Sequence, residues 1–322
     1  MLKRLFAAGA MLAFATLCVA QDFPTHAITI VVPFAAGGPT DTVTRLIAQG
    51  MTKSLGQTVI VENVGGAGGT IGVEKVAHST PNGYTLLLMH IGIATSASMY
   101  RNLRYDAQRD LDPIGLVIDV PMTMIAKPGF APKDVRELNA YVKANKDKVT
   151  YAHAGVGSAS HLCGMLYLSA IQADVTTVPY KGTGPAMTDL IGGQVDFMCD
   201  QTTNTTQQIK GGKVKAYAVT SPKRVASLPD LPTFDESGLK GFEVTVWHGL
   251  WAPHETPKAV IDKLDAALQA ALRDPSTIAR FAELGGEPVP QNRATPEALR
   301  AHLKSEIEKW SPIIKKAGVY AD

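Results

Sequence analysis

The chain has 322 residues, of which 45% are hydrophobic and 19% are charged, so it can bury sizeable cores and suits two domains of ordinary size. Its 31 basic and 29 acidic side chains nearly balance, which gives no electrostatic footprint for nucleic acid or anionic lipid. If the protein binds an anion, the attraction must therefore be local.

The first twenty residues have the layout of a cleaved secretory signal. Lys3 and Arg4 form a short positive start, Leu5–Ala20 contains no charged residue, and a small-x-small pattern ends just before Gln21, as in secretory signals. An uncleaved anchor is the weaker alternative, because about sixteen apolar residues are short for a bilayer span of about twenty. We therefore expect cleavage of residues 1–20 and export to the periplasm, with 29 basic and 29 acidic side chains left in the mature chain.

The next part of the chain alternates short β-branched runs with amphipathic helices, which favours an α/β architecture with largely parallel sheets. Each expected strand is followed by a loop that contains glycine. The expected strands are 28–32, 58–62 and 84–90, and the expected helices are 42–55 and 71–77.

A second α/β unit follows an apolar stretch that runs through Pro121. One of its helices begins at Pro185 and stops at Gly192, the expected placement of proline and glycine at helix ends. The other expected elements are helices at 133–145 and 161–172 and strands at 149–153, 175–180 and 195–200.

The last third has a segment rich in Pro, Asp and Gly at 228–241, an apolar strand at 242–251, and then helices at 258–272, 276–284 and 296–317. These helices have no strands of their own, so we expect them to pack on the first unit. The sequence thus predicts a discontinuous first domain, an inserted second domain, two crossings between them and a cleft. The expected boundaries are 21–120 with 226–322 for the first domain and 121–225 for the second.

Four glycine-bearing loops, two in each unit, connect the end of a strand to the start of a helix: 33–41, 65–70, 154–161 and 180–185. Glycine lets backbone N–H groups approach a ligand, and a helix start adds partial positive charge. Ligands in open α/β sheets bind outside the carboxyl ends of strands, so amides from facing loops can converge on one carboxylate. A structural turn is the alternative for the second loop, and neither a dinucleotide fingerprint nor a P-loop fits the chain.

A catalytic interpretation is less favoured. Ser158 or Ser160 with His161 and Asp200 would be a conceivable triad, but there is no G-x-S-x-G elbow, and a serine so near its own histidine makes poor triad geometry. The chain also has no H-E-x-x-H and no paired C-x-x-C pattern, so we expect no metal site. A periplasmic serine hydrolase remains an alternative function, as does a sensory receptor that presents its liganded form to a signalling partner.

Two cysteines, Cys163 and Cys199, follow the signal segment. In an oxidising compartment they can pair, with a stabilisation of about 4 kcal/mol on the chain-entropy estimate. Two separately buried thiols are the alternative, because sequence alone cannot place the two Cα atoms within bonding range.

Several longer motifs occur in a fixed order along the whole mature sequence. They are IVVPFAAGG at 30–38 followed by Asp41, VEN at 61–63 leading into the glycines of 65–69, PNGYT at 81–85, SHL at 160–162, VPYKG at 178–182, GQVD at 193–196, LPDLPT at 228–233 and GLWAP at 249–253. With them the chain resembles the Bug-type receptors of tripartite tricarboxylate transporters. One departure is Cys199, where that family more often has a large apolar residue.

The resemblance implies a two-domain α/β fold of the type II periplasmic-binding-protein class, also called a Venus flytrap. It implies a monomer without cofactor that captures a small carboxylate, such as a di- or tricarboxylate or an aromatic acid, by domain closure and delivers it to a membrane permease. The ligand contacts it implies come from the four loops and the strand ends beside them. They are Phe34, Ala36, Gly37, Gly38, Thr40, Ala67, Gly68, His90, Ile91, Gly92, Gly157, Ser158, Ser160, Tyr180 and Asp200.

Overall fold

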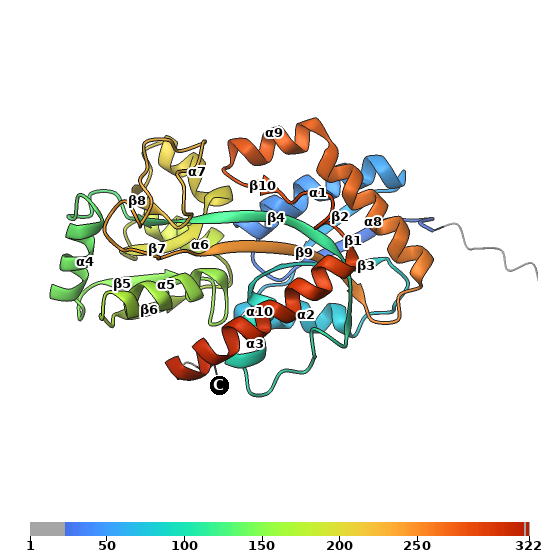
Figure 1. The fold of residues 1–322 in the computed structure, drawn as a ribbon, viewed down its shortest axis with the longest axis horizontal. Helices are drawn as coiled ribbons and strands as arrows, with labels where there is room; N and C mark the ends of the chain where they lie inside the picture. The colour runs from blue at the N-terminus through green and yellow to red at the C-terminus, as the bar shows by residue number, and fades with distance from the viewer. Residues whose placement is uncertain (1–22, 319, 322) are drawn as a thin grey trace, which may run out of the picture.

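The strands form one mixed sheet of ten strands that runs the length of the molecule (Figure 1). A computed structural model describes residues 23–318, 320 and 321, so the expected signal segment lies outside the described residues. From edge to edge the order is β2 (Val59–Asn63), β1 (Ile28–Val32), β3 (Thr85–His90), β9 (Thr245–Pro253), β4 (Leu111–Ala126), β7 (Phe197–Gln201), β5 (Thr150–His153) and β6 (Thr176–Pro179). Off this path, β8 (Lys215–Val219) and β10 (Glu287–Pro288) both pair with β4.

The part of the molecule around β1, β2 and β3, called the first half here, has the parallel arrangement expected of strand–helix–strand units. Ile28, Ile30, Val31 and Val32 are fully buried because helices cover both faces of a parallel sheet. The helices are α1 (Pro39–Leu55), α2 (Thr70–Ala77) and α3 (Gly92–Met99), with the short 3₁₀ turn η1 (Ala67–Gly69) before α2.

Two long strands connect this first half to the rest of the sheet. β4 pairs antiparallel with β9 over residues 111–121, and its later residues, 122–126, pair with β7 and β8. β4 contains Pro113 and Pro121, and the register with β9 shifts twice, at Pro113/Gly115 and at Leu116/Ile118. Figure 1 shows β4 and β9 side by side as the two long arrows that join the two ends of the molecule.

The second half comprises β5 to β8 and four helices. The helices are α4 (Val135–Ala144), α5 (Ala159–Ala170), α6 (Thr183–Ile191) and α7 (Thr202–Lys210). Neither α7 nor β8 was expected from the sequence. The sequence of α7 is rich in threonine and does not predict a helix. Four of its threonines are nevertheless buried in the structure.

The C-terminal helices pack against the first half. They are α8 (Lys258–Arg273), α9 (Pro275–Glu283) and α10 (Pro296–Ala317). Helix α8 lies so close to α1 that a Cβ at Gly50 would overlap Ala271, and α10 packs on α3 and β4. The domain boundaries expected from the sequence remain a prediction.

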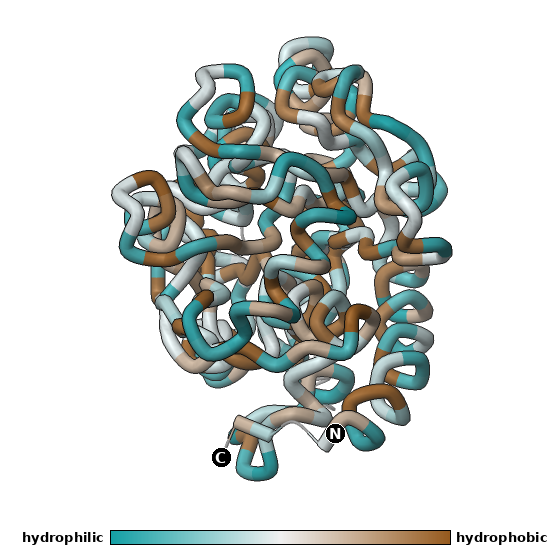
Figure 2. The backbone as a smooth tube through the Cα atoms, turned by 90° about the vertical axis from the view of Figure 1, so that its left-hand side faces the viewer, coloured by the Kyte–Doolittle hydropathy of each residue, from teal (hydrophilic) through white to brown (hydrophobic). Residues whose placement is uncertain are grey.

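Burial is shared by both halves. One hydrophobic cluster extends through them, and a smaller one lies under α6 around Met187, Leu190 and Met198. Figure 2 shows hydrophobic residues interspersed with hydrophilic ones along the backbone, as expected where each element buries one face. Within the described part of the chain, no helix combines the length and apolar character needed to cross a bilayer.

A disulfide joins Cys163 in α5 to Cys199 in β7, with 6.1 Å between the Cα atoms and 36 positions between them in sequence. The bridge ties the helix that follows the third glycine loop to the strand that ends at the site described next.

Candidate ligand-binding site

The loops of the two halves meet around one small, partly open cavity. It leaves about 10 Å³ for the centres of water molecules, room for about one water, so the two halves are closed on each other. The residues that line it come from both halves: Phe34, Gly38, Pro39, Thr40, His90, Ala154, Ser158, Ala159, Ser160, Thr183, Asp200 and Gln201.

Four helices begin at this cavity. Gly38 is the N-cap of α1, Ser158 the N-cap of α5 and Gln201 the N-cap of α7, and Thr183 is the first residue of α6. The N-terminus of a helix carries partial positive charge and free backbone N–H groups, which together favour an anion. None of the lining residues is Lys or Arg, so the favourable field comes from the main chain.

The loop before α1 is held by Asp41. Its carboxylate accepts hydrogen bonds from Gly37 N at 3.0 Å, from Asn63 Nδ2 at 3.0 Å and from Arg45 Nε at 3.0 Å. Burial alone would raise the pKa of Asp41, but the hydrogen bonds from Arg45, Gly37 and Asn63 outweigh it and lower this pKa below its usual value. Asp41 therefore fixes the loop and does not line the cavity.

Direct contacts between loops close the two halves on each other. Ala35 N donates to Lys181 O at 2.8 Å, and Tyr100 Oη donates to Val156 O at 2.9 Å. Gly68 has φ of +60° and lies against the same Val156 carbonyl, which a Cβ at Gly68 would overlap. Glycine is therefore required there for the closed arrangement.

The serines of the third loop act as structural hydrogen-bond partners. Ser158 Oγ accepts from His161 N at 3.2 Å, which caps α5, and Ser160 Oγ accepts from Ala154 N at 2.8 Å. Among the described residues, no hydrogen bond joins the His161 ring to either serine or to Asp200. This geometry is not that of a serine nucleophile with its base.

Three histidines near the cavity accept a backbone N–H at Nδ1 from a nearby glycine of the same loop. Burial lowers the pKa of two of them, His90 and His161, to about 4, and lowers the pKa of the third as well. All three are therefore neutral imidazoles that order the loops. The pairs are His90 with Gly92, His153 with Gly155, and His161 with Gly157. Across the described residues, no group of three potential ligand side chains is placed to hold a metal ion.

Hydrogen-bond acceptors line the second-half wall of the cavity. Asp200 is 1% exposed, and burial raises its pKa to about 6 although Asn204 Nδ2 at 2.6 Å and Gln201 N at 2.8 Å both donate to it. Within the described chain, Gln201 Oε1 and Thr183 Oγ1 are buried without a hydrogen-bond partner. Thr183 Oγ1 still lies near enough to Asp200 to favour its ionised form. Unpaired buried polar atoms are costly, and they point to an occupant that satisfies them.

The cavity brings together seven of the residues expected from the sequence: Phe34, Gly38, Thr40, His90, Ser158, Ser160 and Asp200. The other eight do not line it, and their role in binding stays a prediction. Tyr180, for example, donates its Oη to Asp189 at 2.7 Å. These eight are Ala36, Gly37, Ala67, Gly68, Ile91, Gly92, Gly157 and Tyr180.

Sequence reasoning missed five lining residues. Thr183 lies in the fourth glycine loop, and Gln201 directly follows Asp200 at the end of a strand, so position alone could have indicated both. The missed residues are Pro39, Ala154, Ala159, Thr183 and Gln201.

The comparisons with known proteins agree with this architecture. The periplasmic binding protein BugD is 57% identical, with a TM-score of 0.91 over 92% of this chain and 99% of that one. MatC from Rhodopseudomonas palustris, solved with bound malate, is 42% identical, with a TM-score of 0.87 over 91% of this chain and 100% of that one. Another R. palustris protein, solved with adipate, is 31% identical, with a TM-score of 0.87 over 92% of this chain and 98% of that one.

These likenesses confirm the predicted periplasmic-binding-protein fold. The model of the tripartite tricarboxylate transporter family receptor, TctC, matches residues 43–319. The chain therefore belongs to the TctC family, which is a family of solute-binding receptors and not of enzymes, as the sequence motifs predicted.

Proposed function

We propose that this protein captures a small carboxylate in the periplasm by closing its two halves around it, and delivers the solute to the permease of a tripartite tricarboxylate transporter. The observation that carries the proposal is the convergence of four helix N-termini on one cavity between the two halves. MatC was solved with malate and a second relative with adipate, and both ligands are carboxylates.

Closure follows from differential contact. A carboxylate held by amides of α1 in the first half and of α5 and α6 in the second half interacts with both halves only when they are close together. Because the cavity has room for about one water, the halves must lie slightly further apart when they hold such a ligand. A ligand shifts a conformational equilibrium by its difference in affinity for the two states. The crossing strands β4 and β9 are the natural place for the accompanying bend, since they join the two halves.

The hydrogen-bond acceptors on the second-half wall of the cavity restrict which carboxylates can bind there. Asp200 accepts hydrogen bonds, and Gln201 Oε1 is an acceptor without a partner among the described residues, so both favour a ligand that carries a hydroxyl or ammonium group on its carbon chain. A second bare carboxylate at this wall would face the buried Asp200 and meet like-charge repulsion. We therefore propose a hydroxy- or amino-substituted carboxylate.

A thermal-shift screen of the mature protein tests both whether it binds a carboxylate and whether it prefers one with a hydroxyl or ammonium group. Malate and aspartate carry a donor group, succinate has the same carbon chain without one, and amines and neutral sugars serve as controls. A ligand at a hundred times its dissociation constant should add about 2.7 kcal/mol of stability. If only neutral or cationic solutes raise the midpoint, the carboxylate assignment is wrong.

The variant Asp200→Asn distinguishes general carboxylate binding from a preference for hydroxy- or amino-substituted carboxylates. This variant should still bind succinate but lose the preference for malate or aspartate over succinate. An unchanged preference would mean that Asp200 does not accept a hydrogen bond from the hydroxyl or ammonium group of the ligand. It would not contradict general carboxylate binding.

Three further parts of the proposal concern the mature chain. We propose that cleavage leaves Gln21 as the first residue, that the mature protein is a monomer, and that its domains are 21–120 with 226–322 and 121–225. Intact mass of the secreted protein, sedimentation and limited proteolysis test these points in turn.

A further inference from the structure

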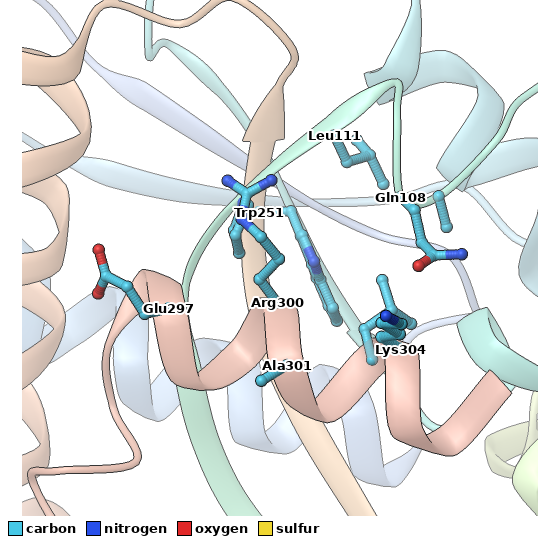
Figure 3. Close-up of a pocket in the computed structure, with 10 residues that line it drawn as sticks. Gln108, Leu111, Trp251, Glu297, Arg300, Ala301 and Lys304 are labelled. Carbon is cyan, nitrogen blue, oxygen red and sulfur yellow. The ribbon is translucent and has the colours of Figure 1, made fainter. Parts of the chain in front are cut away.

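A second pocket lies on the first half, between α10 and the start of β4 (Figure 3). Its volume is about 400 Å³, within the range of small-molecule sites, and it shares no lining residue with the cleft cavity. Its lining residues are Ala107, Gln108, Leu111, Pro113, Trp251, Glu297, Arg300, Ala301, Leu303 and Lys304.

The floor of this pocket contains an unusual tryptophan. Trp251 is 1% exposed, yet its Nε1–H donates to no described residue. The chain has three tryptophans, and the other two, Trp247 and Trp310, both donate Nε1–H to Glu306 Oε2, at 3.0 and 2.9 Å. The Nε1–H of Trp251 has no partner among the described residues and is not one of the fully enclosed unpaired atoms, so it is a donor that an occupant of the pocket can use.

Two cationic side chains lie at the mouth of the same pocket. Arg300 and Lys304 are one turn apart on α10 and exposed, and neither forms an ion pair with another residue of the described chain. Figure 3 shows Arg300 extending from α10 beside Trp251, with Lys304 one turn further on. Glu297 lies at the opposite end of the pocket, with its carboxylate turned away from Arg300.

Apart from the amide side chain of Gln108, the rest of the pocket is apolar. Leu111, Pro113 and Leu303 are buried and form its walls with Ala107. An occupant therefore needs an apolar body for these walls and an anionic head that accepts from Trp251 and pairs with the two cations. A small inorganic anion would leave the walls unfilled, and an apolar solute would leave the indole N–H and the cations unpaired.

We infer that this pocket is a second ligand site, which binds a small organic anion with an apolar body, such as a medium-chain or aromatic monocarboxylate. The anionic head accepts from Trp251 Nε1–H and pairs with Arg300 and Lys304. The site is independent of the cleft. Its walls include the first residues of β4 and the Trp251 end of β9, so an occupant contacts both strands that cross between the halves.

Octanoate is the probe for this site, and the indole N–H signals of ¹⁵N-labelled mature protein are the readout. Loss of a signal in Trp251→Phe assigns the Trp251 resonance. Octanoate should move that resonance in a saturable manner and leave those of Trp247 and Trp310 in place. Acetate lacks the apolar body and octylamine carries a cationic head, so neither should move it.

A pair of double variants tests the role of charge. Arg300→Gln with Lys304→Gln should weaken octanoate binding at least tenfold. The control, Lys315→Gln with Lys316→Gln, removes the same charge from exposed positions at the end of α10 and should leave the affinity unchanged. Both pairs are on the surface, so neither variant should impair folding.

The inference is overturned if octanoate leaves the Trp251 resonance in place, if octylamine moves it equally, or if both double variants bind octanoate alike. Binding in the cleft is a separate outcome. It would persist in the Arg300/Lys304 variant and weaken about tenfold or more in Gly68→Ala, which opposes closure of the cleft, whereas binding at the α10 pocket should keep its affinity in Gly68→Ala.

Discussion

The two halves of the cleft hold their loops by different means. In the first half, a network of hydrogen bonds and an ion pair around Asp41 orders the loop, and the carboxylate of Asp41 accepts from Gly37, Arg45 and Asn63 and not from the cavity. In the second half, a disulfide ties α5 to β7, and the acceptors of Asp200 and Gln201 face the cavity. Asp41 therefore preorganises the single helix start of the first half, whereas the second half contributes the other three helix starts together with the acceptors that we propose discriminate between solutes.

The largest effect should come from removing the covalent tie of the second half. Cys163→Ala with Cys199→Ala should lower the free energy of unfolding by about 4 kcal/mol, because the unfolded chain regains the entropy that the disulfide removes by closing a loop of this length. Denaturant unfolding of the oxidised protein and the double variant measures it. A loss below about 1 kcal/mol would mean that packing alone holds α5 on β7.

The Asp41 network should contribute somewhat less. Asp41→Ala should cost about 3 kcal/mol of unfolding free energy, because it leaves Gly37 N and Asn63 Nδ2 without their acceptor. The matched control is Asp262→Ala, which breaks another carboxylate–cation pair four positions apart, Lys258–Asp262, on the surface. That change should cost about 0.5 kcal/mol or less, and equal losses in the two variants would contradict the proposed role of Asp41.

Contact between the halves can be weakened without touching either network. Gly68→Ala should reduce ligand affinity about tenfold or more, because its Cβ would overlap Val156 O and oppose closure. Gly193→Ala is the control, since Gly193 also has a positive φ, +77°, but open space around it. Calorimetric titration of both variants with the cleft ligand distinguishes lost closure from backbone strain, which both variants share.

The smallest effect concerns the pH dependence of the loop histidines. The folded pKa of His161, about 4, lies below its usual 6.5, so its contribution to stability is complete above pH 6.5 and is lost as the pH falls towards 4. His161→Asn keeps an acceptor for Gly157 N but does not titrate. Between pH 7 and pH 5.5 the variant should therefore lose about 1 kcal/mol less stability than the parent protein, as followed by denaturant unfolding at each pH. Parallel losses would mean that folding does not lower the pKa of His161.

The sequence predicted the parts of this molecule that leave a local pattern. Strand ends followed by glycine and a helix start located all four loops, and the apolar periodicity located α8 and α10 closely. β4 was expected only as an apolar stretch, because Pro113 and Pro121 read as interruptions of a strand. α7 was not expected, because its threonine-rich sequence has no apolar stripe.

The missed site residues have a different cause. Thr183 and Gln201 are single polar residues that carry no motif, and their importance comes from where the second half places them. The same holds for Trp251, which belongs to a recognisable motif but gains an unpaired donor only once α10 packs beside it.

The convergence of four helix starts has a consequence for how such a receptor can diversify. Its positive potential comes from main-chain dipoles, so a point substitution cannot delete it while the fold persists. Mutations at the cavity wall can therefore change which solute is preferred, while the helix starts still bind the carboxylate group that these solutes share. Proteins with this fold can therefore evolve new solute specificities by single substitutions, through intermediates that each still bind a solute.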